Sequence, residues 1–255
     1  MRIIALLFVC AAALCGQDPF EIVVFEYEPL PLGAYTYEAH FNYVLDGTKS
    51  FAGPVAPTQD QLHFSSEWTM GITDAFRAGV VVLIARLPGR EPEYAGFRLL
   101  PHFYAPRSWH LPLNLGLVTE LSFERALFDE NTRQLEIRGI IEKHVGRLQM
   151  DGNLVFGRAF HGLGVGNGWD VEPSARIGWQ LSKSLTPSLE YYSSLGPIGN
   201  FLPGKEQIHL LFPGADWKIA KQVKWSFGLG VGMTDAGSHL ILKSRFEFEF
   251  GKEHD

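Results

Sequence analysis

A histidine and a serine in this chain are spaced as a catalytic pair could be. His63 and Ser65 are two residues apart, and Glu67 lies two further on. On a β-strand such residues share one face, so the imidazole could take the serine proton at hydrogen-bond distance, as nucleophilic catalysis requires. Residues two apart on a strand also meet often by chance. We therefore predict no catalytic residue, and we keep hydrolysis through Ser65 and His63 as the least favoured alternative.

Motifs that could bind a cofactor are weak. Residues 162–166 read Gly-Leu-Gly-Val-Gly, like a glycine-rich nucleotide loop, but no helical pattern follows, so we expect a flexible outer loop. The nine histidines are scattered without metal-ligand spacing. The net charge is −6 and basic clusters are absent, which argues against a nucleic-acid partner. We predict no cofactor, no metal site and no enzyme activity.

A two-residue alternation positions these side chains. In residues 34–45, Tyr35, Tyr37 and Phe41 fall on one face, whereas Glu38 and His40 fall on the other. Successive side chains of a β-strand point to opposite faces, so this segment is aromatic on one side and polar on the other. The same alternation predicts strands, with boundary errors of about two to four residues, at residues 34–45, 61–70, 75–85, 96–105, 111–125, 132–145, 148–158, 169–181, 185–194, 206–217, 223–233 and 239–250.

The connections between these segments alternate in length. Tight turns are expected at residues 71–74, 146–147 and 182–184, and longer loops rich in Gly and Pro at 46–60, 86–94, 159–168 and 196–205. Short periplasmic turns and longer outer loops are typical of outer-membrane barrels. We predict an all-β fold: a transmembrane antiparallel up-and-down β-barrel of about 12 strands, formed by residues 34–250.

Composition distinguishes this barrel from two other classes of protein. Hydrophobic residues make up 46% of the chain and aromatic residues 13%, yet the mean hydropathy is only +0.01. A bundle of transmembrane helices is excluded, because no apolar run of about 18 residues occurs after the N-terminal region. A soluble β-sandwich shows the same periodicity. It would leave two long apolar edges, which barrel closure removes.

Charged and imidazole side chains gather on the polar face, which would line the lumen. Most of them are expected to form ion pairs that hold the strands in register, and the alternative is a selectivity filter for a small solute. A twelve-stranded lumen would be narrow, or bridged by ion pairs. The lumen-lining candidates are Glu38, His40, His63, Glu67, Arg98, His102, Glu120, Glu136, Arg138, Glu142, Asp151, Arg176, Glu190, Lys243, Arg245 and Glu247; Arg77, Glu124, Glu172 and Lys224 share the same faces.

The N-terminal region carries an export signal. Arg2, an apolar run at residues 3–9 and small residues at 11–16 predict a secretory signal peptide in residues 1–17, cleaved between residues 13 and 17. A buried N-terminal helix and a lipid anchor at Cys15 are the alternatives. The chain has two cysteines, Cys10 and Cys15, and both lie in this region, so we expect no disulfide framework.

Two short segments flank the barrel domain. Residues 18–33 are acidic and contain three prolines, and we assign them to a periplasmic N-terminal segment. A small plug and a strand across the barrel mouth are the alternatives. Residues 251–255 form a C-terminal tail after Phe250, whereas outer-membrane barrels usually end on the aromatic residue itself.

Several stretches resemble a known family. The turn Trp-Thr-Met-Gly-Ile-Thr-Asp-Ala-Phe at residues 68–76 resembles hairpins of small outer-membrane barrels. With residues 135–146, 153–159 and 173–196, the chain resembles the barrels grouped as transporters of the phenol-degradation MetA-pathway type. The resemblance implies an outer-membrane location and a transport role linked to aromatic compounds, and it supplies no site residues. A twelve-stranded outer-membrane phospholipase also carries His and Ser two residues apart, but on the lipid face.

These observations lead to one function and two alternatives. We predict a monomeric barrel, surrounded by outer-membrane lipid, that acts as a narrow passive channel for small solutes, among them aromatic compounds. The first alternative is a non-conducting structural or adhesive barrel that acts through its outer loops. The second is the membrane-embedded lipid hydrolase.

Overall fold

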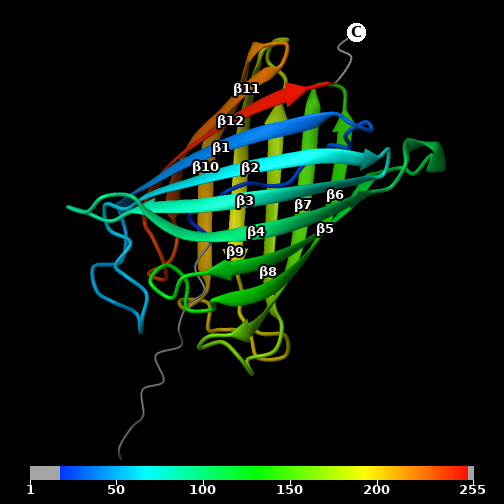
Figure 1. The fold of residues 1–255 in the computed structure, drawn as a ribbon. Coiled ribbons are helices and arrows are strands. Elements are labelled where there is room, and N and C mark those ends of the chain that lie inside the picture. Colours follow the sequence, from blue (N-terminus) through cyan, green and yellow to red (C-terminus); the bar gives the residue numbers. More distant parts are fainter. Residues whose placement is uncertain (1–17, 252–255) are drawn as a thin grey trace, which may run out of the picture.

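The predicted alternation is realised as a closed barrel in the structure, a computed structural model that describes residues 18–251. Each strand pairs antiparallel with its neighbours in sequence, and the first pairs with the last, so the prediction of a 12-stranded up-and-down barrel is confirmed (Figure 1). The strands are β1 (Tyr35–Asp46), β2 (Leu62–Thr73), β3 (Phe76–Arg86), β4 (Glu93–Tyr104), β5 (Asn114–Glu124), β6 (Arg133–Val145), β7 (Leu148–His161), β8 (Asp170–Trp179), β9 (Leu185–Ser194), β10 (Ile208–Ala220), β11 (Val223–Gly232) and β12 (Leu240–Phe250).

The predicted signal peptide in residues 1–17 and the tail beyond Gly251 lie outside the described residues. Across residues 18–251, no helix has the length and apolar character needed to cross a bilayer.

The outer face of the barrel is apolar. Trp68, Leu99, Leu117, Ile141 and Ile177 are exposed there, as expected for side chains that meet lipid. Aromatic rings gather where β1, β2, β11 and β12 meet near the C-terminus: the ring pairs are Tyr35 with Phe250, Tyr37 with Trp68, and Trp225 with Phe246. Aromatic residues concentrate in this way at the membrane interfaces of outer-membrane barrels.

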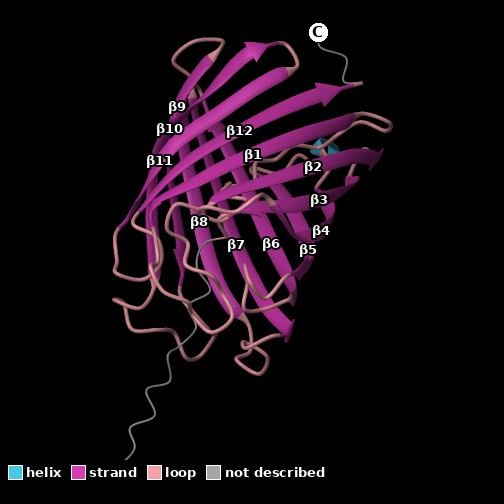
Figure 2. Ribbon diagram, turned by 60° about the vertical axis from the view of Figure 1, so that its left-hand side comes forward, coloured by secondary structure: helices cyan, strands magenta, loops and turns pink. Residues whose placement is uncertain are grey.

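The two ends of the barrel differ, as Figure 2 shows. At the short-turn end, two-residue connections join β2 to β3, β6 to β7, and β10 to β11. The opposite, long-loop end carries residues 47–61 and 195–207. One connection departs from this sorting, because residues 105–113 at the short-turn end are long and contain the short 3₁₀ helix η1 (Arg107–Trp109).

One predicted turn is shorter than expected. The prediction placed it at residues 71–74, but β2 continues to Thr73 and leaves only Asp74 and Ala75 outside the strands. The Thr73 hydroxyl oxygen accepts hydrogen bonds from the backbone N–H groups of Phe76 and Ala75, at 3.1 and 3.3 Å. Because this side chain accepts hydrogen bonds from both N–H groups of the turn, the pairing of β2 with β3 can continue almost to the turn.

Residues 18–33, hereafter the plug segment, run through the barrel, and residues 31–33 at its exit are exposed. The segment starts at the long-loop end, where Phe20 packs on Phe128, and leaves at the short-turn end, where Gly33 N–H donates to the Gly71 carbonyl. The expectation of a periplasmic segment outside the barrel therefore needs correction, and the plug arrangement is the one observed. The reason is apolar burial, because Phe20, Ile22, Val24 and Leu30 are almost fully enclosed.

The plug segment divides the interior into two apolar clusters. Val23, Phe25 and Tyr27 pack with residues of β3 to β6, including Leu83 and Leu100. The intervening Ile22 and Val24 point the other way and pack with Tyr192, Ile208, Leu210, Phe212 and Ile241. An extended chain alternates its side chains, so the apolar stretch at residues 22–25 packs into one cluster on each of its two sides.

Where the plug segment leaves the barrel, its close approach to β2 requires a glycine at position 71. A Cβ added at Gly71 would lie 2.1 Å from the Pro31 carbonyl oxygen, so Gly71→Ala must displace the segment. We expect Gly71→Ala to lower the free energy of unfolding by about 1–3 kcal/mol, measured by urea unfolding in detergent micelles. Gly204→Ala is the control, because no atom lies within 4 Å of its added Cβ. Equal losses in both variants would contradict this account.

Candidate functional site: a plugged lumen

The sixteen sequence-predicted lumen residues are placed in the barrel interior. Fourteen are buried, and Glu136 and Arg138 are half-buried. The structure brings most of them into contact with one another or with the plug segment. Whether any of them contacts a solute stays a prediction.

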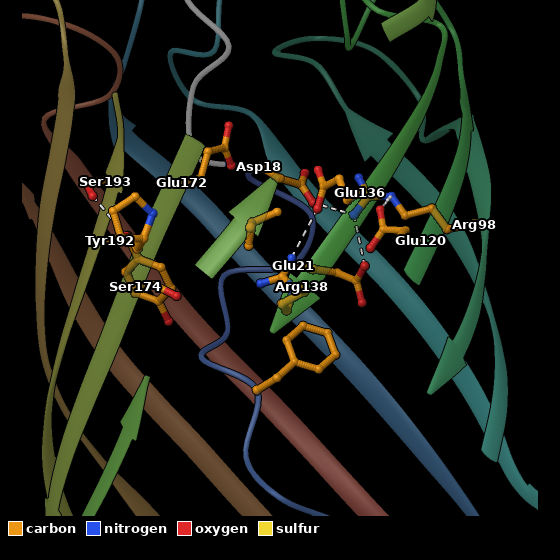
Figure 3. A pocket seen from close by; sticks show the side chains of 13 residues that line it. Asp18, Glu21, Arg98, Glu120, Glu136, Arg138, Glu172, Ser174, Tyr192 and Ser193 are labelled. Carbon is orange, nitrogen blue, oxygen red and sulfur yellow. Dashed lines mark hydrogen bonds and ion pairs between the residues drawn. The ribbon is translucent and has the colours of Figure 1, made fainter. Parts of the chain in front are cut away.

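Arg98 organises the long-loop end of the lumen. Its guanidinium contacts two carboxylates of the plug segment, Asp18 at 2.5 Å and Glu21 at 2.9 Å. It also contacts two from the wall, Glu124 at 2.6 Å and Glu120 at 3.3 Å. Figure 3 shows the plug segment running through the middle of the barrel beside this cluster. One buried cation therefore holds the start of the plug segment against β4 and β5.

Arg176 on β8 makes a second link. It pairs with Asp151 at 3.0 Å, with Asp216, and with Glu26 of the plug segment at 3.6 Å. Nearby, Lys243 pairs with Glu190, whose carboxylate also accepts a hydrogen bond from Tyr192.

Glu28 makes the third link, towards the short-turn end. Its carboxylate lies 3.2 Å from the ammonium group of Lys224, which also pairs with Glu247 at 2.7 Å. Arg77 donates to the Glu28 carbonyl oxygen at 2.8 Å. The acids of the plug segment thus meet wall cations along its whole length.

The backbone of the plug segment is satisfied by side chains of the wall. Asn153 accepts a hydrogen bond from the N–H of Phe25 and donates one to its carbonyl, at 2.7 and 2.9 Å. The N–H of Tyr27 donates to Glu142 at 3.0 Å, and Asn42 donates to the Phe20 carbonyl at 3.2 Å. These bonds replace a strand ladder, so the segment can remain extended inside the barrel without pairing to a strand.

The His63 and Ser65 side chains do not form a catalytic pair. Ser65 donates its hydroxyl proton to the Phe20 carbonyl at 3.2 Å, and the His63 ring packs edge-on against the Phe20 ring at 4.7 Å. Neither ring nitrogen of His63 has a hydrogen-bond partner among residues 18–251. The geometry therefore gives no support to the hydrolase alternative.

Two of the cavities in the described part of the barrel lie beside the plug segment. The smaller, of about 20 Å³, is drawn in Figure 3 and is lined by Glu21, Arg138, Glu172 and Ser174 among others. The larger, hereafter the vestibule, has about 170 Å³ at the long-loop end. Its apolar lining includes Phe20, Phe128, Ile208, Leu210 and Ile241, and its acidic lining is Asp18, Glu124, Asp129, Glu130, Glu136, Asp170 and Glu172. Its lining within residues 18–251 includes no Lys, Arg or His.

Sequence reasoning missed the residues of the plug segment that complete the site. Asp18, Glu21, Glu26 and Glu28 supply four of the carboxylates that the wall cations contact. A usable signal exists in the sequence, because these acids are interspersed with large apolar residues within a short stretch. Such a stretch suits a charged lumen better than bulk water.

Comparisons with known proteins agree with the fold. No family model and no curated protein matches the chain. An outer membrane channel from Pseudomonas putida F1 is 12% identical, with a TM-score of 0.60 over 90% of this chain and 100% of that one. The KdgM porin is 9% identical, with a TM-score of 0.55 over 84% and 99% of the two chains. The NanC porin is 6% identical, with a TM-score of 0.55 over 85% and 100%.

At these identities the comparisons show a shared fold. They show a barrel of the same architecture, and they do not single out the phenol-degradation type that the sequence resembles.

The Arg98 cluster yields a prediction about anchoring. Arg98→Gln leaves four carboxylates without their shared cation, so we expect a loss of about 3–5 kcal/mol in unfolding free energy and faster proteolysis of the plug segment. Arg125→Gln is the matched control, because its guanidinium is exposed and pairs with Glu93 at 3.1 Å on the surface. We expect that control to cost about 1 kcal/mol or less. Unchanged proteolysis in Arg98→Gln would show that apolar packing alone anchors the segment.

Proposed function

We propose that the chain is a narrow passive channel for small solutes in the outer membrane, and that the plug segment sets the width of its path. One observation carries the proposal. The closed barrel has a charged interior, and the segment inside it is held by side chains instead of by strand pairing. The fold shared with outer membrane channels and porins supports it.

The vestibule indicates which solutes would enter. Short turns face the periplasm in barrels of this kind, so the vestibule would open outward. Its wall combines aromatic and aliphatic side chains with seven carboxyl groups, of which Asp18 and Glu124 pair with Arg98 and Glu136 pairs with Arg138. Such a wall favours neutral or cationic solutes with an apolar or aromatic body and disfavours carboxylates. The link to aromatic compounds implied by the family resemblance fits this chemistry for amines and neutral compounds better than for acids.

The plug segment must move, or leave a side path, for solute to pass. Its apolar side chains fill the middle of the barrel, and its acids pair with wall cations. This packing is also the observation that favours the alternative of a non-conducting barrel, so the experiment has to separate the two.

A reversible lock tests movement of the plug segment. Asn153 exchanges two hydrogen bonds with the backbone of Phe25, so Phe25→Cys with Asn153→Cys would place one cysteine on each side of the contact between the plug segment and β7, and mass spectrometry checks that oxidation joins them. We expect conductance in planar bilayers when the pair is reduced and a severalfold lower conductance when it is oxidised. Each single cysteine variant is a control and should not respond to redox state. Silence of the wild type and the reduced pair would favour the non-conducting barrel.

The vestibule acids predict a pH-dependent selectivity. Desolvation of the Asp129 carboxyl in the loop between β5 and β6 raises its pKa to about 6, and nearby Asp18 and Glu130 act in the same direction against the opposing charge of Arg98. A carboxyl with a raised pKa is neutral below that pH and charged above it, so cation preference should weaken as the pH falls through about 6.

Reversal potentials in a salt gradient at pH 7.5 and pH 5 measure this preference. We expect Asp129→Asn to have a lower cation preference than the wild type at pH 7.5 and to differ little from it at pH 5. An equal difference at both values of pH would contradict the assignment.

A further inference from the structure

Ion pairs account for only part of one polar cluster in the lumen. Glu21 of the plug segment, His40 of β1 and Glu67 of β2 each offer one ligand atom, and these atoms all lie within 4.8 Å of one another. The three residues are 7%, 2% and 4% exposed, so water does not stabilise their charges. They come from three separate stretches of chain, which is why sequence spacing predicted no metal site.

Two atoms of this cluster have no hydrogen-bond partner within residues 18–251. They are Oε1 of Glu21 and Nε2 of His40. Arg98 contacts the other oxygen of Glu21, and the nearest acid oxygen to His40 Nε2, on Glu38, lies 3.3 Å away without hydrogen-bond geometry. A buried polar atom without a partner has lost its hydrogen bonds to water and gained none in the protein, so such atoms call for an additional ligand.

Glu67 also lacks a cation of its own. No Lys or Arg in the described part of the chain lies within ion-pairing distance of it, and across the β1–β2 ladder it faces Glu38. Like charges directly opposite each other destabilise a sheet. Thr69 donates its hydroxyl proton to the Glu67 carboxylate at 2.7 Å and thereby orients it.

A second group of acids shows the contrast. Glu28, Glu38 and Glu247 also lie within 4.8 Å of one another. There, however, Lys224 contacts Glu28 and Glu247, and Arg245 contacts Glu38 at 3.2 Å. Protein cations already neutralise that group.

We propose that Glu21, His40 and Glu67 bind a divalent transition-metal ion of the Zn²⁺ class, which ties the plug segment to the barrel wall. An imidazole nitrogen with two carboxylate oxygens is a donor set that zinc accepts, whereas Mg²⁺ and Ca²⁺ prefer oxygen alone. A tetrahedral ion with bonds of about 2.1 Å holds its ligand atoms about 3.4 Å apart, so modest side-chain rotations would complete the site. Its positive charge would compensate Glu67, and it would supplement the one charge that Arg98 shares among Glu21 and three other acids.

Metal content tests the site directly. Protein purified from membranes is stripped with EDTA, dialysed against ZnCl₂ and analysed for zinc. We expect about one zinc ion per chain more in the wild type than in His40→Ala, Glu67→Gln or Glu21→Gln. The difference between wild type and variant isolates this cluster from Cys10 and Cys15. Glu21→Gln lies outside every strand, so it leaves the barrel ladder untouched.

His144→Ala is the control, because His144 also pairs with a lumen glutamate but is largely exposed. It should retain the wild-type zinc content. Thr69→Val removes the group that orients Glu67, and we expect about a 10–100-fold weaker affinity for zinc. Equal zinc content in the wild type and all three ligand variants, or none in the wild type, would overturn the proposal.

Protease digestion provides a second, independent readout of the link to the wall. We expect zinc to slow cleavage of the plug segment relative to EDTA in the wild type and to have no such effect in Glu21→Gln. Identical cleavage of the wild type with zinc and with EDTA would show that no metal ties the segment down. Neither measurement depends on whether the barrel conducts.

Discussion

Closure of the backbone hydrogen-bond ladder is the constraint on which the rest of this molecule depends. In hydrocarbon no water can satisfy an unpaired amide, so β1 must pair with β12, as it does from Tyr35 with Phe250 to Asp46 with Leu240. In a closed barrel, a wall one strand thick separates the lipid outside from the lumen inside. The outer face can then be largely apolar, and most charged side chains in the middle of the strands are turned into a confined space.

The charged side chains in the lumen are buried, so they must pair with one another. Arg98, Arg176 and Lys224 are each surrounded by carboxylates from both the wall and the plug segment. The segment brings apolar bulk as well, since its alternate side chains enter two separate clusters. The segment is therefore held in the barrel both by ion pairs and by apolar packing. Apolar burial resists withdrawal of the segment, whereas charge pairs can exchange partners as it shifts.

The strands were predictable because each has one lipid face and one lumen face. Residues 185–194 were predicted as a strand with the bounds that β9 has in the structure. The plug segment was misplaced for a complementary reason. Both of its faces are buried, so its apolar residues run together at Ile22, Val23, Val24 and Phe25 and no period of two survives.

β3 shows the same effect within the barrel wall. Its inner face carries Val81 and Leu83, which pack in the cluster that contains Phe20 and Val23 of the plug segment. Contacts across such distances in sequence cannot be derived from local spacing. Arg98 was predicted to face the lumen, but its partners Asp18 and Glu21 belong to a segment about 80 residues away, as the separations of 80 and 77 show.

The route of the plug segment also constrains how the barrel can be assembled. The segment begins at the long-loop end and joins β1 at the opposite end, so the chain passes through the barrel before it forms the barrel wall. The seam between β1 and β12 must then close around a segment already in place, or the free end must be threaded afterwards through a crowded interior. If the seam closes around the segment, the last hydrogen bonds to form are those between β1 and β12, and they enclose residues 18–33.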